Sequence, residues 1–487
     1  MTLSLLVAYD KPRPDMATQA PCPGISDVRH IISQDTAEGA IIMEQTHRSY
    51  TVKDLLTTEV APALGCTEPI AIALATAAAA SLMPDDTIER VEIWVDPNIY
   101  KNGIAVAIPG TQGNTGLDLA ASIGALGGDP RRRLEVLEPI TEDIVAAAKT
   151  FVDSGRVTVN LLRDQKGLFI EGKVTGNGKT AVCTIRDYHD NIVSLTLNDR
   201  TVKGSPLLQP DDRHKSKLDP RELEAWLKHL TLSDLLRLVD DMDSEDLAFI
   251  KEGIQYNVRL AEHGLKFGSG LGIGKTLERL VRQKLIKKDM ILAARILTSA
   301  ASDARMQGVK LPAMSSAGSG NHGLTAVLPI WAVKDYVDCE EQSVLEAVGL
   351  SHILTAYIKA HTGRLTAICG CSVAAGAGAT AGISYLLGGD QKHIAGAIMN
   401  LTEDLAGVIC DGAKAGCSLK LATAAGTAVQ SALFALQGVH VQATDGIISA
   451  SPETTMKNIG ELSVQGMVEA DRTILKIMLE KQFGDVS

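Results

Sequence analysis

Residues 369–389 have the sequence CGCSVAAGAGATAGISYLLGG, in which a short break of cysteine and glycine leads into an apolar helix of small residues. Three other segments follow the same pattern: GCTEPIAIALATAAAA from residue 65, SSAGSGNHGLTAVLPIWAV from residue 315 and CDGAKAGCSLKLATAAGTAVQSALFAL from residue 410. Their spacing is irregular, which argues against a solenoid of regular repeats. The pattern instead predicts four helix N-termini that converge on one site.

The composition favours a helical protein whose core is built from small side chains. Of the 487 residues, 45% are hydrophobic and only 3% are aromatic, and 44 are glycines. Small side chains suit closely packed helices better than a sandwich of aromatic-rich strands. The formal net charge of −11 repels nucleic-acid phosphates and anionic lipids. We therefore expect neither nucleic acid nor a membrane as a partner.

Three further features predict a cytoplasmic protein. The longest apolar run, from Ile70 to Met83, is shorter than the roughly 20 residues that span a bilayer. The N-terminal sequence MTLSLLVAYDKPRPD has its basic residues after the apolar run, which is the wrong order for a secretory signal. Eight cysteines are also too few for a disulfide scaffold of this length.

The residue patterns divide the chain into four parts. Apolar and polar residues alternate as in strands in VEIWV, IAVAIPG, RVTVNLL, LFIEGKV, AVCTIRD and IVSLTLN, and the polar segment PDDRHKSKLDPRE is the best candidate for a linker. The expected fold class is α+β, with a mainly α-helical Gly/Ala-rich domain and an inserted α+β domain. The predicted parts are a tail at 1–46, a discontinuous helical domain at 47–85 and 295–487, an α+β domain at 86–205, and a linker with a helical segment at 206–294.

Most of the cysteines lie at the breaks, namely Cys66, Cys369, Cys371, Cys410 and Cys417. A thiol at a helix N-terminus meets unpaired N–H groups and the positive end of the helix dipole, so we expect lowered pKa values and thiolates suited to metal. The spacings match neither zinc fingers nor ferredoxins, so the residues leave zinc, an iron-sulfur cluster and redox thiols open. The alternative is that cysteine acts as a small buried hydrophobic residue, which we expect of Cys22, Cys183 and Cys339.

The break SSAGSGNHG combines small residues, hydroxyl groups, an amide and an imidazole. The N–H groups of such a turn can bind a carboxylate or a phosphate, although a simple capped loop is the alternative. Beside the cysteines, Asn321 and His322 become candidates for holding or deprotonating a small anionic substrate. The other glycine-rich run, Gly268 to Thr276, does not fit a nucleotide-binding P-loop, because Ser269 stands where that motif requires glycine.

Four motifs together resemble the L-cysteine desulfidase family, which is also the serine dehydratase-like alpha-subunit family UPF0597. They are GCTEPIAIALA, GSGNHG, TGRLTAICGCSVAAG and CDGAKAGCSLK, and the likeness extends from about residue 45 to the C-terminus. The resemblance implies an oxygen-sensitive 4Fe-4S cluster and no pyridoxal phosphate. By motif, its ligands would be Cys66, Cys371 and Cys410, with Cys369 as an alternate for Cys371 and Cys417 as a spare ligand.

The resemblance also implies a function, a lyase that degrades L-cysteine to hydrogen sulfide, ammonia and pyruvate by α,β-elimination. Ser319 and Asn321 of the SAGSGNHG turn, together with Arg364, would bind the substrate carboxylate, and His322 or Lys414 would be the base. An L-serine dehydratase with the same cluster is the first alternative. A zinc-binding or redox-thiol protein without catalysis is the second. The expected partner is a small amino acid, and the sequence leaves open whether the chain forms a homo-oligomer.

Overall fold

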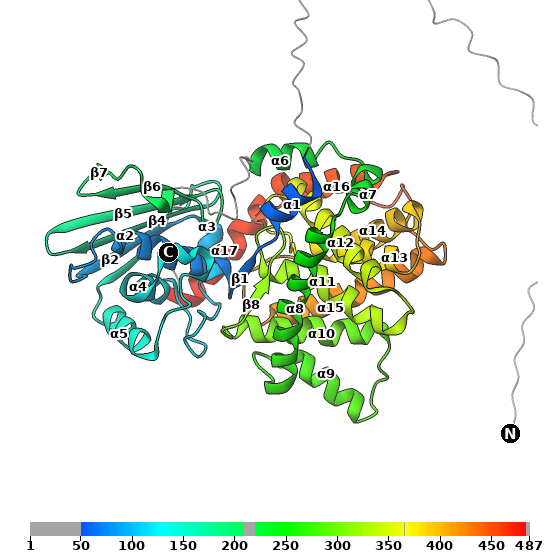
Figure 1. Ribbon diagram of the computed structural model, residues 1–487, viewed down its shortest axis with the longest axis horizontal. Coiled ribbons are helices and arrows are strands. Elements are labelled where there is room, and N and C mark those ends of the chain that lie inside the picture. The colour runs from blue at the N-terminus through cyan, green and yellow to red at the C-terminus, as the bar shows by residue number, and fades with distance from the viewer. Residues whose placement is uncertain (1–49, 209–219, 365, 484–487) are drawn as a thin grey trace, which may run out of the picture. The chain divides into compact units, whose positions relative to one another are not determined.

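The computed structural model describes residues 50–208, 220–364 and 366–483, and its fold is α+β, as predicted (Figure 1). It has two large hydrophobic cores, one between a six-stranded sheet and its helices, the other among the helices of the second half. We call the elements around these cores the sheet part and the helical part. The predicted tail at 1–46 and most of the predicted linker PDDRHKSKLDPRE lie outside the described residues.

The sheet has the strand order β3-β2-β4-β5-β6-β7. Its strands are β2 (Arg90–Val95), β3 (Val157–Leu161), β4 (Phe169–Gly176), β5 (Lys179–Arg186), β6 (Ile192–Leu197) and β7 (Arg200–Thr201). The pair β2 and β3 is parallel, and the other neighbours are antiparallel. Burial alternates along β5, which places one face of that strand in the core, so the period-two pattern of the sequence predicted this strand correctly.

Helix α2 (Thr67–Ala80) packs directly on the sheet, and α4 (Leu117–Gly127) and α5 (Glu142–Asp153) pack in turn behind it. The approach is close because Gly172 of β4 has no side chain where the backbone of Ala75 and Thr76 passes. The apolar side of α2 therefore belongs to the core of the sheet part. The predicted domain boundary after residue 85 had grouped this helix with the helical part.

One predicted strand, IAVAIPG at residues 104–110, is wrong. Asp96 accepts hydrogen bonds from the N–H groups of Asn98 and Ile99 and so begins helix α3 (Pro97–Gly103) directly after β2. The chain has therefore left the sheet before residue 104. The segment continues in turns, and the N–H of Gly110 donates to the carbonyl of Gly308 in the helical part. Residues 106–109 are all buried, which reflects packing between the two parts and not strand pairing.

The helical part contains most of the remaining helices. They are α1 (Val52–Glu59), α6 (Pro220–Leu227), α7 (Leu232–Asp240), α8 (Ser244–Phe267), α9 (Ile273–Arg282), α10 (Met290–Met306), α11 (Gly320–Val333), α12 (Glu341–Thr362), α13 (Ala374–Leu386), α14 (Gln391–Leu405), α15 (Cys417–Leu436) and α16 (Pro452–Glu461). Small residues permit their close contact: a Cβ atom on Gly378 of α13 would lie 2.5 Å from the carbonyl oxygen of Ser351 in α12. The glycine-rich run after α8 follows a helix, in agreement with the rejection of a P-loop.

Two connections join the parts. The short strands β1 (Pro62–Leu64) and β8 (Pro312–Met314) pair in antiparallel register. The last helix, α17 (Val468–Phe483), returns to the sheet part, where Leu475 and Leu479 join its core. There Asp471 forms an ion pair with Lys101 of α3, whose side chain is almost completely buried.

Among the described residues, only α15 is long and apolar enough to cross a bilayer by length and composition. About 61% of its most apolar window is buried inside the protein. Several of its residues, including Ala424 and Val429, belong to the core of the helical part. A helix that is buried on most of its sides in a protein core is apolar all round, and this burial accounts for the apolar composition of α15.

Candidate active site

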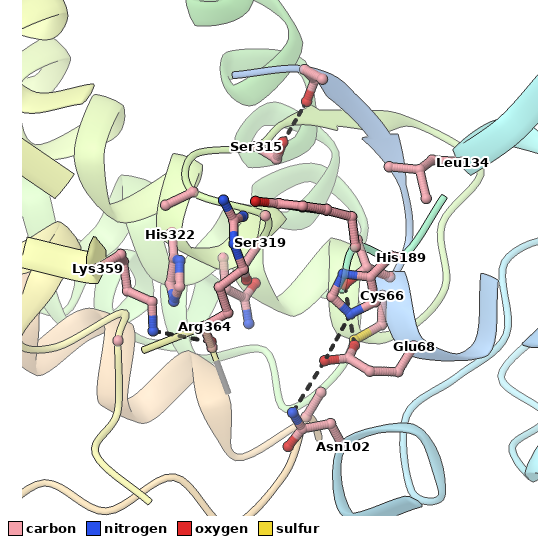
Figure 2. Close-up of a pocket in the computed structure, with 18 of the residues that line it drawn as sticks. Cys66, Glu68, Asn102, Leu134, His189, Ser315, Ser319, His322, Lys359 and Arg364 are labelled. Atoms are coloured by element: carbon pink, nitrogen blue, oxygen red, sulfur yellow. Dashed lines mark hydrogen bonds and ion pairs between the residues drawn. The ribbon is translucent and has the colours of Figure 1, made fainter. Parts of the chain in front are cut away.

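A cavity of about 490 Å³ lies where the breaks before α2, α11, α13 and α15 meet (Figure 2). Its lining includes the cysteines of all the breaks that contain them, Cys66, Cys369, Cys371, Cys410 and Cys417. It also includes Ser319, Asn321, His322 and Arg364. The four breaks thus converge on one place, as their sequences predicted. Cys183 is buried in β5 and Cys339 precedes α12, so neither lines the cavity, and Cys22 lies outside the described residues.

A single backbone pairing brings two of the thiol loops together. Ile368 and Ile409 form an isolated antiparallel bridge. The N–H of Cys369 donates to the carbonyl of Val408 at 2.9 Å, and the N–H of Cys410 donates to that of Ala367 at 2.6 Å. Cys369 and Cys410, which are distant in sequence, consequently lie on adjacent backbone segments.

Cys66 reaches the cavity from the sheet part, at the N-cap position of α2. Before it, Gly65 has a φ of +63°, and a Cβ atom there would collide with Pro109. The Cys66 thiol donates to Oε2 of Glu68 at 2.8 Å, and Nδ2 of Asn102 donates to Oε1 of the same carboxylate at 3.1 Å. The buried Glu68 carboxylate is therefore held beside the thiol.

The prediction that the helix N-termini lower the thiol pKa values is wrong for most of these cysteines. Burial raises the pKa of Cys66 and Cys410, and it raises the pKa of Cys417 to about 11. Cys371 donates a hydrogen bond to Cys369, which raises its own pKa and lowers that of Cys369. The loss of water around a buried thiolate outweighs the helix dipole at these positions.

Three cationic side chains near the thiols were not singled out from the sequence. Lys359 of α12 is buried, its ammonium donates to the carbonyl of Arg364 at 3.0 Å, and burial lowers its pKa to about 8. Lys420 forms an ion pair with Asp411. Arg305 of α10 is only 2% exposed, donates through Nη2 to the carbonyl of Gly65, and leaves Nε without a hydrogen-bond partner among the described residues. The sequence signal that could have indicated these residues is a charged residue within an otherwise apolar helical segment.

Arg364, expected to bind a carboxylate, is already engaged. Its Nε donates to Oε1 of Glu224 at 2.9 Å, and its Nη2 donates to Oε1 of Glu59 at 2.7 Å. Its guanidinium group also stacks on the ring of Tyr188, 4.3 Å from the ring centre. Two carboxylates thus offset its charge, and the groups available to a further anion are few.

The two bases expected from the sequence are placed differently. His322 lines the cavity, with Nδ1 3.2 Å from the carbonyl of Ser316, so that the ring donates there and carries its lone pair on Nε2. This Nε2 faces Gly370, where a Cβ atom would lie only 2.4 Å from it. Burial lowers the pKa of His322 to about 3. Lys414 does not line the cavity, and its ammonium forms an ion pair with Asp411.

A second imidazole enters the cavity from the sheet part and was missed in the sequence. His189 lies in the turn between β5 and β6, in the segment DYHDN, whose polar residues are typical of a turn and do not by themselves indicate a site. Its Nε2 lies 3.9 Å from Oε1 of Glu68 (Figure 2). This nitrogen is buried and has no hydrogen-bond partner among the described residues.

The arrangement of the thiols bears on the cluster that the resemblance implies. Among the described residues, no three His, Cys, Asp or Glu side chains come close enough to bind a single metal ion. A 4Fe-4S cluster has a different requirement, because its irons occupy separate corners and each thiolate binds one of them. The thiols border one cavity, and Lys359, Lys420 and Arg305 offset the negative charge that such thiolates carry. The residues present therefore fit a cluster better than a single ion.

Comparison with known proteins identifies relatives over nearly the whole described chain. The family described as Serine dehydratase alpha chain matches residues 131–476. The UPF0597 protein of Desulfatibacillum aliphaticivorans is 60% identical over 436 residues, which cover 89% of this chain and 99% of that protein. The UPF0597 protein of Clostridioides difficile is 42% identical over 426 residues, which cover 87% and 98%. This chain therefore belongs to the UPF0597 family of serine dehydratase alpha chain-like proteins.

Proposed function

We propose that the protein is an iron-sulfur-dependent lyase that converts L-cysteine to hydrogen sulfide, ammonia and pyruvate. The observation that carries this proposal is one cavity in which five thiols meet a buried guanidinium group and a buried carboxylate. A guanidinium group and a carboxylate in one cavity can bind the carboxylate and the ammonium group of an amino acid. Membership of a family similar to serine dehydratase supports an elimination on such a substrate.

Cys66, Cys371 and Cys410 would hold a 4Fe-4S cluster, with Cys369 and Cys417 as alternates. When bound, the cluster supplies a Lewis acid that makes sulfide a better leaving group. The chain's own contribution is to offset charge: Lys359 and Lys420 lie near the thiols and lower the cost of several negative charges in a buried site. The proposed reaction uses no pyridoxal phosphate.

The substrate carboxylate would bind to Arg305 and the N-terminus of α11. The Nε of Arg305 is buried, lacks a partner and packs against Gly320, at the first residue of that helix. The N–H groups of this helix terminus, with Ser319 and Asn321, add donors aimed at the same anion. Arg305 takes the role that the sequence suggested for Arg364, because the charge of Arg364 is already offset by two carboxylates.

The substrate ammonium group would bind to Glu68. Its carboxylate is only 6% exposed, and its contacts with Cys66 and Asn102 fix its position. The Cys66 thiol donates to Glu68, and Arg305 donates to the carbonyl of the preceding residue, Gly65, so the two charges lie on the same side of the cavity. An amino acid held between them would present its Cα and Cβ atoms to the thiol-lined space.

L-serine dehydration is the second candidate, favoured by the description of the matching family. The same two charges would bind L-serine, and hydroxide would leave in place of sulfide. The ratio of kcat/KM for L-cysteine and L-serine decides between them. A higher value for L-serine would replace the first proposal with the second.

The first test of the cluster is the content of iron and acid-labile sulfide in protein purified without oxygen. We expect about four of each per chain. Zinc, or no metal after attempted reconstitution, would instead support a zinc-binding or redox-thiol protein without catalysis. An oxygen-sensitive cluster suits the reducing cytoplasm, where we propose that the protein acts on a small amino acid as its only required partner.

A further inference from the structure

The turn that carries His189 is anchored on both sides of that residue. Before it, Asp187 forms an ion pair with Arg221 at 2.6 Å, and the Tyr188 ring supports the guanidinium group of Arg364. After it, the carbonyl of Asp190 accepts a hydrogen bond from Arg133 at 3.2 Å. These contacts hold the turn against elements of both parts of the molecule. His189 is thus held at the cavity by its neighbours, although its own Nε2 bonds to none of them.

A buried ring nitrogen without a partner is costly, so its retention points to a ligand or a reacting group in the cavity. His189 lies 3.9 Å from the Glu68 carboxylate, on the side of the cavity where the ammonium group of an amino acid would bind (Figure 2). The Cα–H bond of that amino acid is adjacent to its ammonium group. A base beside Glu68 is therefore close to the proton that must be removed.

The other candidate bases are less well placed. The Nδ1 of His322 is bonded to Ser316, and its Nε2 packs against the backbone of Gly370 between two thiols. Lys414 lies outside the cavity lining and is paired with Asp411. A general base must keep a lone pair open toward the substrate. Among the described imidazoles that line the cavity, His189 is the one whose Nε2 is a buried ring nitrogen without a hydrogen-bond partner, and no backbone segment is recorded against it as Gly370 is against His322.

We propose that His189 is the catalytic base of the elimination, a role that rests on the proposed function in taking an α-amino acid as substrate and in binding its ammonium group to Glu68. The proton passes from Cα to Nε2 of His189. The electron pair of the C–H bond becomes the second bond between Cα and Cβ, and the pair of the Cβ–S bond leaves with sulfur as HS⁻. The products of this step are aminoacrylate, HS⁻ and the protonated imidazole, so atoms and charge balance.

The test compares His189→Asn and His189→Gln with the wild type and with His440→Asn, a control at an exposed histidine outside the cavity. All four proteins are prepared without oxygen and matched for iron content. Two rates are measured: sulfide release from L-cysteine, and exchange of the Cα hydrogen of L-alanine in D₂O by NMR. L-alanine has the same ammonium and carboxylate groups but no leaving group, so its exchange reports the base alone.

We expect both His189 variants to lose about 100-fold or more in kcat and in the exchange rate, with KM changed by less than about threefold. The control should match the wild type. A smaller loss in the variants, or no exchange in the wild type, would overturn the assignment of His189. Exchange without sulfide release in the wild type would instead refute the desulfidase proposal and leave the base assigned.

Discussion

The two sides of the cavity are built in opposite ways. The helical part supplies Cys369, Cys371, Cys410 and Cys417 from loops that one backbone bridge holds together. The sheet part supplies only Cys66, but it also brings Glu68, Asn102 and His189. Thiols thus concentrate on one side of the cavity, and a carboxylate, an amide and an imidazole lie on the other. Neither part contains a complete site, which places the proposed chemistry at their contact.

The largest expected effect comes from removing one thiol on either side. Cys66→Ser in the sheet part and Cys410→Ser in the helical part should each lower kcat about 1,000-fold or more, because loss of the Lewis acid is worth several kcal/mol. Both should also lose the visible absorbance of the cluster. Cys339→Ser, outside the cavity, is the matched control. Retention of absorbance and turnover in Cys66→Ser would mean that the helical part holds the cluster alone.

The next effect concerns the residue that binds the carboxylate. Arg305→Gln should lower kcat/KM for L-cysteine about 100-fold, mainly through KM, since hydrogen bonds between charged groups contribute about 1.5–3 kcal/mol. Arg364→Gln should change KM less, because Glu59 and Glu224 already engage that guanidinium group. Steady-state kinetics on both variants shows which substitution raises KM more. A larger KM increase in Arg364→Gln would return to Arg364 the carboxylate-binding role expected from the sequence.

A pH effect on stability should come from the sheet part. Burial raises the pKa of Asp96 to about 6, above its ordinary value of 3.8. The folded state then holds this proton more tightly than the unfolded state, so stability should fall as pH rises, by about 2 kcal/mol between pH 4 and pH 6. Denaturant unfolding should show this fall in the wild type.

The control for this pH effect is a pair of variants. Asp96→Asn cannot titrate, so the contribution to the slope between pH 4 and pH 6 should disappear. Asp390→Asn, an exposed helix cap of the helical part, should keep the wild-type slope in that range. Equal slopes in the wild type and Asp96→Asn would show that Asp96 does not cause the effect.

The smallest effect should come from Gly370→Ala in the helical part. The new Cβ atom would overlap Nε2 of His322, and repacking of a crowded site costs about 1–3 kcal/mol. We expect a loss of about tenfold in kcat and a lower melting temperature. Gly376→Ala, whose Cβ atom would meet the flexible Leu401 at 3.3 Å, is the matched control. Equal kcat and melting temperature in the two variants would show that the contact between His322 and the loop of Cys369 and Cys371 does not stabilise that loop.

The sequence predicted the fold class and most elements because local patterns carry that information. Alternation predicted β2 and β3 through β6, and the breaks predicted the N-termini near Cys66 and Cys417. It failed at residues 104–110, where the apolar residues are buried by packing between two parts and not by strand pairing. It also grouped α2 with the helical part, because the apolar run shows that the helix is buried but does not show against which partner.

The sequence by itself determined that the cysteine-containing breaks precede small-residue helices, because each break and its helix are local in the chain. Only the tertiary structure decided what faces the thiols. Arg305 and His189 lie far from the cysteines in sequence, and they meet them through the pairing of β1 with β8 and the anchored turn after β5. The partners of a charged side chain depend on which surfaces are buried together, and no local pattern of residues encodes that choice.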